Sequence, residues 1–249
     1  MKRVDRHLAG IAFDLEGTLI NVETYHFQAF SMAMRDVAGV EITFLEILET
    51  VPYALGGGDH RIARELAAAT GEDVAWETVL EAKRKSYEML ISGVSITPRP
   101  GAREVISEFI ALGFQVAIGS LTPRKQAEHL LHESGLLKMF RPECFVFAED
   151  VLNKKPAGDV YIKTALRMGI DPRQQLVFDD SDVGLEAARS AKSTAIGMPV
   201  FHLRDTLATL GHAGPARIFY DWREVNVLAL IENLEQELRE QDHGRYSED

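Results

Sequence analysis

The sequence FDLEGTL occupies residues 13–19 and directly follows a short apolar run. Its two carboxylates, Asp14 and Glu16, stand two residues apart at the point where a buried strand is predicted to end. Gly17 permits a tight turn or a close backbone approach, and Thr18 adds a hydroxyl group. Because ligands of open α/β sheets bind beyond the carboxyl ends of the strands, we expect Asp14 to project into the binding crevice.

Short apolar runs like the one before this stretch recur along the chain. They predict strands at residues 10–14, 114–120, 144–150, 175–180, 193–198 and 216–221. Helical patterns lie between most of them, at 101–113, 122–135, 157–169 and 184–191. Apolar strands that alternate with amphipathic helices are typical of a parallel sheet covered on both faces. We therefore predict an α/β fold with a doubly wound, Rossmann-like parallel sheet.

The region 21–97 interrupts this alternation. It contains helical patterns such as ETYHFQAFSMAMRDVAG and AWETVLEAKRKSYEMLISG, but no convincing strand. It closes at SITPRPG, residues 95–101, whose two prolines suit a hinge. The sequence thus predicts two domains: an α/β core formed by residues 1–20 and 98–249, and a helical cap domain inserted after the first strand, at 21–97.

The composition argues against several classes of function. With 249 residues and 46% apolar side chains, the chain can bury a sizeable core. Its formal net charge of −11 argues against nucleic acid and anionic membranes as partners, since both recruit basic surfaces. The sequence has no apolar run near the ~20 residues that span a bilayer. Its start lacks the apolar segment of a secretory signal, and a single cysteine cannot form an internal disulfide, so we expect a cytoplasmic protein.

Further polar side chains follow later predicted strands or lie in the loops after them: Ser120, Lys155, Asp179 and Asp180. Each has an ordinary alternative. Ser120 or Thr122 could cap the helix that begins after Pro123, Asp180 or Ser181 could cap the helix after the acids, and Lys155 could be a surface lysine. Their ordered recurrence in one parallel sheet favours a shared site. Together with Asp14 they supply a nucleophilic carboxylate, a hydroxyl and an ammonium that bind an anion, and carboxylates for a hard cation. This combination suits phosphoryl transfer.

These residues form an ordered set of motifs. The motifs are Asp14-x-Glu16-Gly17-Thr18, Ser120, Lys155-Pro156 and Asp179-Asp180-Ser181-x-x-Gly184. The set resembles the four motifs of the haloacid dehalogenase superfamily. It is most similar to the branch with a helical cap after the first motif, which includes beta-phosphoglucomutase and related sugar-phosphate phosphatases. The resemblance runs from about residue 11 to residue 198, which is most of the chain.

The resemblance implies a catalytic role for four of these residues. Asp14 would attack phosphorus and form an aspartyl-phosphate. Glu16 would protonate the leaving oxygen and later deprotonate the attacking water. Ser120 would bind a phosphoryl oxygen, and Lys155 would offset the charge on Asp14 and the phosphoryl group.

The resemblance also implies a magnesium site and a substrate site. The expected Mg²⁺ ligands are Asp14, Glu16 through its backbone carbonyl, Asp180, and Asp179 either directly or through water. We expect Gly17, Thr18 and Thr122 to take part in substrate binding. The expected partner is a small phosphorylated metabolite, bound by a monomer or weak dimer whose cap closes to exclude bulk water.

Glutamate at position 16 departs from the aspartate that is usual in this superfamily. It reaches roughly 1.5 Å further, and a misplacement of about 1 Å can cost ~100-fold in rate. The carboxyl group is kept, so general acid–base catalysis remains possible. We favour a phosphatase that accommodates the longer acid. Two alternatives stay open: a sugar-phosphate mutase of the beta-phosphoglucomutase kind, and a catalytically idle member that binds a phosphorylated ligand or a protein partner.

The predicted cap offers its own candidates. His26 and Arg61 are hypotheses for substrate binding, because Arg61 could bind a second anionic group and His26 stands near the hinge. A packed histidine and an exposed surface arginine are equal alternatives. We interpret Asp59 as the N-cap of the following helix, and Lys83 and Lys85 as solvated charges.

Overall fold

The computed structural model describes residues 6–51, 54–55, 58–71 and 73–245 of the chain. The chain divides into two compact units, which are described separately below. The core unit comprises Met1–Ile20 and Thr97–Asp249, and the insert comprises Asn21–Ile96. Among the described residues, no helix is both long enough and apolar enough to cross a membrane.

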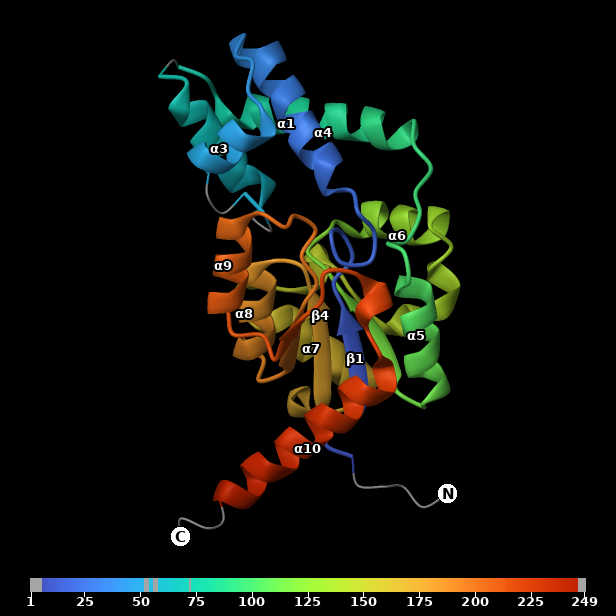
Figure 1. Ribbon diagram of the computed structural model, residues 1–249. Helices are drawn as coiled ribbons and strands as arrows, with labels where there is room; N and C mark the ends of the chain where they lie inside the picture. The colour runs from blue at the N-terminus through green and yellow to red at the C-terminus, as the bar shows by residue number, and fades with distance from the viewer. Residues whose placement is uncertain (1–5, 52–53, 56–57, 72, 246–249) are drawn as a thin grey trace. The chain divides into compact units, whose positions relative to one another are not determined.

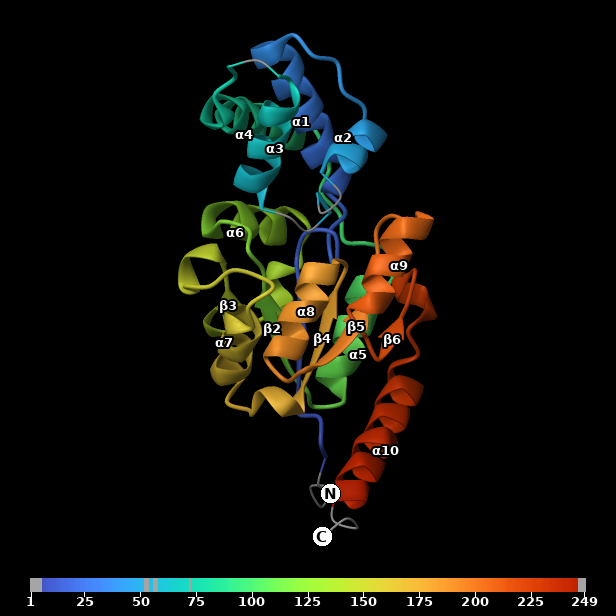
Figure 2. The same cartoon turned by 90° about the vertical axis from the view of Figure 1, so that its left-hand side faces the viewer.

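A six-stranded parallel sheet forms the centre of the core unit (Figures 1 and 2). In space the strands follow the order β3-β2-β1-β4-β5-β6, and every neighbouring pair is parallel. The strands are β1 (Gly10–Phe13), β2 (Gln115–Gly119), β3 (Phe145–Val146), β4 (Gln175–Asp179), β5 (Thr194–Gly197) and β6 (Arg217–Ile218). The predicted α/β class with a doubly wound sheet is confirmed.

Helices cover both faces of this sheet. Figures 1 and 2 show α7 and α8 on one face and α5 on the other. The core helices are α5 (Ala102–Ala111), α6 (Arg124–Glu133), α7 (Asp159–Met168), α8 (Asp182–Ser190), α9 (Arg204–His212) and α10 (Val227–Arg245), with 3₁₀ turns at Leu137–Met139, Pro142–Cys144, Ala148–Asp150, Pro172–Gln174 and Trp222–Glu224. Coverage on both faces explains why β1, at the centre of the sheet, is apolar throughout and every one of its residues is buried.

The register of the sheet brings the ends of its central strands together. Phe13 of β1 pairs with Ile118 of β2 on one side and with Phe178 of β4 on the other. Asp14 therefore leaves the sheet between the ends of two neighbouring strands. Ser120 follows β2, Asp179 is the last residue of β4 and Asp180 follows it, so all of them lie at the carboxyl edge of the sheet.

An aromatic cluster supports the loop that follows β1. Phe13 and Phe178 stack with their ring centroids 5.4 Å apart, and the ring of Trp222 lies 5.0 Å from that of Phe178. Trp222 is fully buried, and its indole Nε1 donates a hydrogen bond of 2.9 Å to the backbone carbonyl of Thr18. The apolar core thereby fixes the backbone of the FDLEGTL loop as well as the strands.

The described part of the insert contains helices and no strand. The helices are α1 (Glu23–Ala38), α2 (Phe44–Thr50), α3 (Asp59–Ala69) and α4 (Trp76–Ser92). Both α1 and α3 pack against α4. A capping box begins α2, because the Thr43 hydroxyl accepts from the Glu46 amide while the Glu46 carboxylate accepts from the Thr43 amide. The helical character expected for this region is therefore present in the structure.

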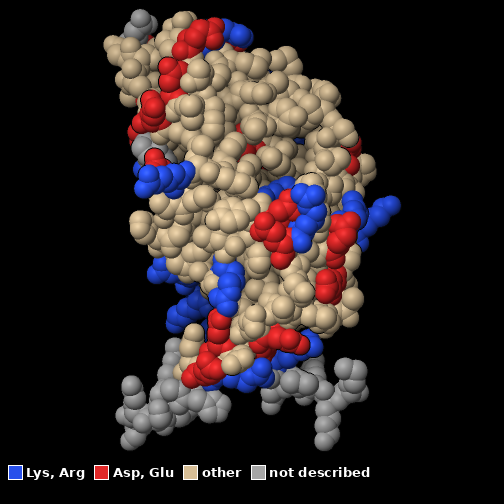
Figure 3. Space-filling view, in the orientation of Figure 1, with Lys and Arg blue, Asp and Glu red and all other residues tan. Residues whose placement is uncertain are grey.

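Charged side chains of both signs share the surface. Figure 3 shows Lys and Arg in small groups, most of them beside Asp or Glu, among the described residues on the face drawn. A face with interspersed charge does not present the continuous basic surface that nucleic-acid backbones recruit.

Candidate active site

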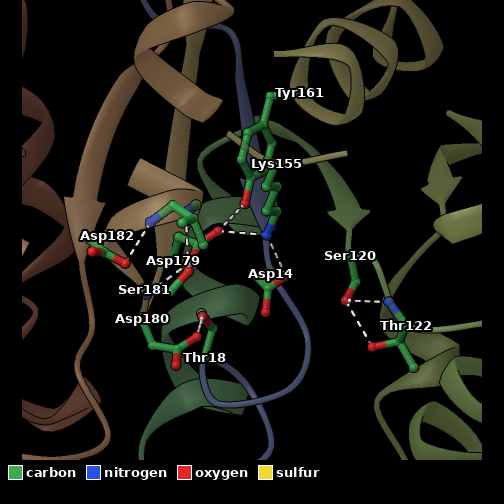
Figure 4. Close-up of polar contacts among 12 residues, drawn as sticks. Asp14, Thr18, Ser120, Thr122, Lys155, Tyr161, Asp179, Asp180, Ser181 and Asp182 are labelled. Atoms are coloured by element: carbon green, nitrogen blue, oxygen red, sulfur yellow. Dashed lines mark hydrogen bonds and ion pairs between the residues drawn. The ribbon is translucent and has the colours of Figure 1, made fainter. Parts of the chain in front are cut away.

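A buried cluster of charges lies where β1 and β4 end (Figure 4). Lys155, in the loop before α7, donates from Nζ to Asp14 Oδ1 and to Asp179 Oδ2, each at 2.7 Å. Asp14 is 6% exposed and Asp179 is 0% exposed. Charges this deeply buried are costly unless they are paired, so the lysine compensates both acids. The structure thus brings together three residues that were predicted from separate motifs.

This cluster has more carboxylates than ammonium groups. Burial raises the pKa of Asp14 to about 7; Lys155 lowers it, but the carboxylates of Asp179 and Glu16 raise it. Burial opposes the charge on Lys155, yet Asp14 and Asp179 hold its pKa well above the usual value. Crowded carboxylates that disfavour one another's ionisation are relieved by a cation. The cluster therefore fits a bound metal ion.

Asp179 is surrounded by hydrogen-bond donors. Its Oδ2 accepts from Lys155 and from the Tyr161 hydroxyl, and its Oδ1 accepts from the Ser181 hydroxyl at 2.8 Å and the Ser181 amide at 3.0 Å. Burial and the charge of Asp179 raise the pKa of Tyr161 well above its usual value, so the hydroxyl stays protonated and donates. A Cβ on Gly184 would lie 2.0 Å from this carboxylate. These contacts suit a residue that orients Lys155.

The loop after β1 also touches the second acid after β4. Thr18 Oγ1 donates to Asp180 Oδ1 at 2.9 Å. Gly17 has φ of +79°, and a Cβ there would lie 2.2 Å from Asp180 Oδ2. Glycine is therefore needed both for the left-handed backbone and for the close approach. As a result, Asp180 lies against the loop that begins with Asp14.

Glu16 is held by a residue that the sequence did not single out. Gln126, in the first turn of α6, donates from Nε2 to Glu16 Oε1 at 2.6 Å. The loop backbone is fixed by Arg99, whose guanidinium donates to the carbonyls of Gly17 at 2.9 Å and Met198 at 2.6 Å. A single glutamine on a helix and a single arginine in a proline-rich loop carry no periodic signal, so neither could be predicted from the sequence.

A pair of hydroxyl groups follows β2. Ser120 Oγ and Thr122 Oγ1 lie 3.0 Å apart, and the Thr122 amide donates to Ser120 Oγ at 3.3 Å. Both residues are buried. Pro123 is the N-cap of α6 and no side chain caps that helix, so the alternative of Ser120 as a helix cap is wrong. Figure 4 shows this pair to one side of the Asp14 cluster.

The insert has a charge cluster of its own, formed around the buried side chain of Lys83. Lys83 donates from Nζ to Asp59 Oδ2 at 2.6 Å, and the same Nζ lies 2.7 Å from His26 Nδ1. Lys83 is 1% exposed, so the interpretation of it as a solvated charge was wrong; Lys85 is exposed, as expected. Arg61 is exposed on α3. A role of His26 and Arg61 in substrate binding stays a prediction.

Asp59 does not cap α3 as the sequence had indicated. The N-cap is Gly58, and Asp59 is the first helical residue. Burial alone would raise the pKa of Asp59, but the charges of Lys83 and His26 outweigh it, so that this pKa lies below its usual value. The carboxylate therefore serves the ion pair with Lys83 instead of the helix terminus.

Comparison with known proteins agrees with this architecture. The model of the haloacid dehalogenase-like hydrolase family matches residues 8–192. The fructose-1-phosphate phosphatase YqaB of Escherichia coli (strain K12) is 30% identical over 189 residues, which cover 76% of this chain and 95% of that protein. The phosphorylated carbohydrates phosphatase of Thermotoga maritima is 27% identical over 226 residues, which cover 89% and 98%.

A solved structure extends the likeness to three dimensions. The crystal structure of CbbY from Rhodobacter sphaeroides in complex with phosphate aligns with a TM-score of 0.72 at 26% identity, and the alignment covers 90% of this chain and 99% of that one.

Proposed function

The chain belongs to the haloacid dehalogenase-like hydrolases, and we propose that it hydrolyses small phosphate monoesters through an aspartyl-phosphate formed on Asp14, with Mg²⁺ bound. The observation that carries this proposal is the buried contact of Lys155 with Asp14 amid an excess of carboxylates at the carboxyl edge of the sheet. Relatives that are named as phosphatases of fructose 1-phosphate and of phosphorylated carbohydrates favour a sugar phosphate as the substrate class.

Asp14 and Asp180 are the side chains that we assign to Mg²⁺, together with the backbone carbonyl of Glu16. The support is chemical: carboxylates are the ligands that this ion prefers, and burial already disfavours the ionisation of Asp14 without it. When bound, the ion supplies charge neutralisation for the phosphoryl group and the attacking acid. We assign Asp179 to the orientation of Lys155, in view of the donors that surround it.

The first half of the reaction would form the covalent intermediate. Lys155 holds Asp14 Oδ1, so we assign the attack on phosphorus to Oδ2. The bond from phosphorus to the ester oxygen breaks as the bond to Asp14 forms. Glu16 gives its proton to the departing oxygen, so that the alcohol leaves neutral and Glu16 becomes a carboxylate.

The second half would return the enzyme to its starting state. A water molecule attacks phosphorus, and Glu16 takes one of its protons. The bond from phosphorus to Asp14 breaks, inorganic phosphate leaves, and Glu16 is protonated again for the next cycle. Two bonds form and two break over the cycle, and the net reaction is hydrolysis of the ester.

Groups around the phosphoryl oxygens would lower the barrier electrostatically. The hydroxyl groups of Ser120 and Thr122 can donate to these oxygens, as can the Lys155 ammonium. Gly17 and Thr18 would contact the same group through the loop. Fixed donors of this kind need no reorganisation during the reaction, which makes them effective in a buried site.

The first test is phosphate release from a panel of sugar phosphates, nucleoside monophosphates and small phospho-acids, with and without Mg²⁺. We expect release that requires both Mg²⁺ and Asp14, with Asp14→Asn inactive and still folded. Conversion of a sugar 1-phosphate to its 6-phosphate without phosphate release would instead identify a mutase. Binding of phosphorylated ligands with no turnover would overturn the enzymatic proposal.

A further inference from the structure

We propose that Gln126 is a positioning residue for the general acid–base Glu16, and that it makes the longer side chain usable in a site that usually carries aspartate. This inference rests on the proposed function. It starts from the 2.6 Å hydrogen bond that Gln126 Nε2 donates to Glu16 Oε1. The two residues are separated by 110 positions in sequence, so the contact depends on the fold.

Glutamate has one more rotatable bond than aspartate, and its carboxylate can therefore take more positions. Ordering such a side chain costs up to about 2 kcal/mol, and a displacement of ~1 Å can lower a rate about 100-fold. A hydrogen bond to one carboxylate oxygen removes much of this freedom. Gln126 therefore supplies the constraint that a shorter aspartate would have by its length alone.

Gln126 stands on a part of α6 that is itself fixed. The Arg124 amide donates to both carboxylate oxygens of Glu149 at 3.1 and 3.0 Å, and the Arg124 guanidinium donates to Asp150 Oδ2 at 2.7 Å. That guanidinium also lies over the ring of Phe147, 5.0 Å from its centroid. The first turn of α6 is thereby tied to the loop after β3, and Gln126 is presented from a rigid element.

The contact constrains Glu16 and leaves the proton transfer to Glu16 itself. Gln126 Nε2 donates to Oε1 and holds the carboxyl group in place. Gln126 itself transfers no proton and touches no substrate in this scheme.

The test is a double-mutant cycle on phosphate release at saturating Mg²⁺. Gln126→Met keeps the length of the side chain and removes the donor, and we expect kcat to fall by about 10- to 100-fold with KM little changed. In a Glu16→Asp background, where the shorter carboxylate does not reach the amide, the same change should have almost no further effect. Lys125 is an exposed neighbour on the same turn, and Lys125→Met is the matched control. Its kcat and KM should equal those of the protein into which it is introduced.

A second readout separates positioning of an acid from loss of structure. Phenyl phosphate and 4-nitrophenyl phosphate are similar in size, but 4-nitrophenolate leaves readily without a proton. Gln126→Met should therefore slow the hydrolysis of phenyl phosphate more than that of 4-nitrophenyl phosphate. A general structural defect would slow the hydrolysis of both esters equally.

The outcomes distinguish this inference from the proposed function. Losses that multiply in the double variant, or equal losses for both aryl esters, would overturn the role of Gln126 while the phosphatase stands. An unchanged kcat in Gln126→Met would do the same. Wild-type protein that releases no phosphate from any ester would overturn the proposed function, and the role of Gln126 with it.

Discussion

Two lysines of this protein, one in the core unit and one in the insert, are buried to a similar degree. The Lys155 side chain, in the core unit, is 6% exposed and contacts two carboxylates. The Lys83 side chain, in the insert, is 2% exposed and contacts the carboxylate of Asp59 and the imidazole of His26. Lys83 also lies over the rings of Phe30 and Tyr87, and Lys155 lies over the ring of Tyr161. The two clusters are therefore built from similar parts.

The pKa values of the aspartates in the two clusters shift in opposite directions. The pKa of Asp14 rises to about 7, because burial and neighbouring acids exceed the effect of Lys155. The pKa of Asp59 falls, because Lys83 and His26 exceed the effect of burial. The difference lies in the balance of charge: the core cluster has an excess of acid, and the insert cluster does not. A buried lysine alone thus does not indicate a metal-dependent site, whereas surplus carboxylates around it do.

The largest expected effect is on activity, and it belongs to the core lysine. Lys155→Met leaves Asp14 and the phosphoryl group without their ammonium, so we expect kcat for phosphate release to fall by about 10²- to 10³-fold. Lys154→Met changes the exposed neighbour and should keep activity within about twofold of wild type. Steady-state kinetics at saturating Mg²⁺ measure both. Similar losses for the two variants would contradict the assignment of Lys155.

The second effect is on stability and belongs to the insert lysine. Lys83→Met leaves the Asp59 carboxylate, whose side chain is 36% exposed, without its ammonium partner, and we expect the free energy of unfolding to fall by about 2 kcal/mol, less than for a fully buried pair. Lys85 forms an exposed pair with Glu81, so Lys85→Met should cost no more than about 0.5 kcal/mol. Urea unfolding of the full chain, followed by circular dichroism, compares the two. Equal costs would show that the buried pair contributes no more than the surface pair.

The contrast between these lysines also shows what the sequence could reveal. Lys155 precedes a proline in an ordered set of motifs, and this order identified it without a structure. Lys83 lies in the run KRK on an amphipathic helix, where the sequence alone favours solvent exposure. Only the packing of α1 and α3 against α4 encloses it. Tertiary packing buries Lys83, and the local sequence pattern does not indicate this packing.

The fold was predictable for a physical reason. Parallel strands covered on both faces are mostly apolar and stand out as short runs, and the runs predicted from the sequence include all six strands of the sheet in the described residues. Residues 201–214 lacked such a signal, and the structure places α9 there. In the site, Tyr161 looks like an ordinary core residue of an amphipathic helix. Its hydroxyl contact with Asp179 became visible only in the structure, where α7 packs against β1 and β2 and Tyr161 reaches the last residue of β4.

The third effect follows from the acid excess in the core. If crowded carboxylates bind Mg²⁺, the ion at 100 times its Kd should raise the free energy of unfolding by about 2.7 kcal/mol. Asp180→Asn should lose most of that gain, whereas Asp59→Asn, in the other cluster, should keep it. Thermal unfolding at a series of Mg²⁺ concentrations gives the comparison. Equal gains in both variants would place the ion elsewhere.

The smallest expected effect is the acid sensitivity of the insert cluster. Folding lowers the pKa of Asp59 below its ordinary value of 3.8. The unfolded chain therefore binds the proton more tightly, and the stabilisation from the Asp59 carboxylate is present above about pH 4 and is lost as pH falls through the lower folded pKa. Asp59→Asn cannot lose this contribution, so its thermal midpoint should decline less than that of wild type between about pH 5 and pH 3.

A third variant tests the cause of that sensitivity. Because Lys83 lowers the pKa of Asp59 more than His26 does, the difference between the acid profiles should shrink when Asp59→Asn is made in a Lys83→Met background. Thermal unfolding at matched ionic strength across this pH range measures all four proteins. Parallel profiles for wild type and Asp59→Asn would mean that the Asp59 carboxylate gains nothing from its partners on folding, and the electrostatic contrast between the two clusters would then rest on the core alone.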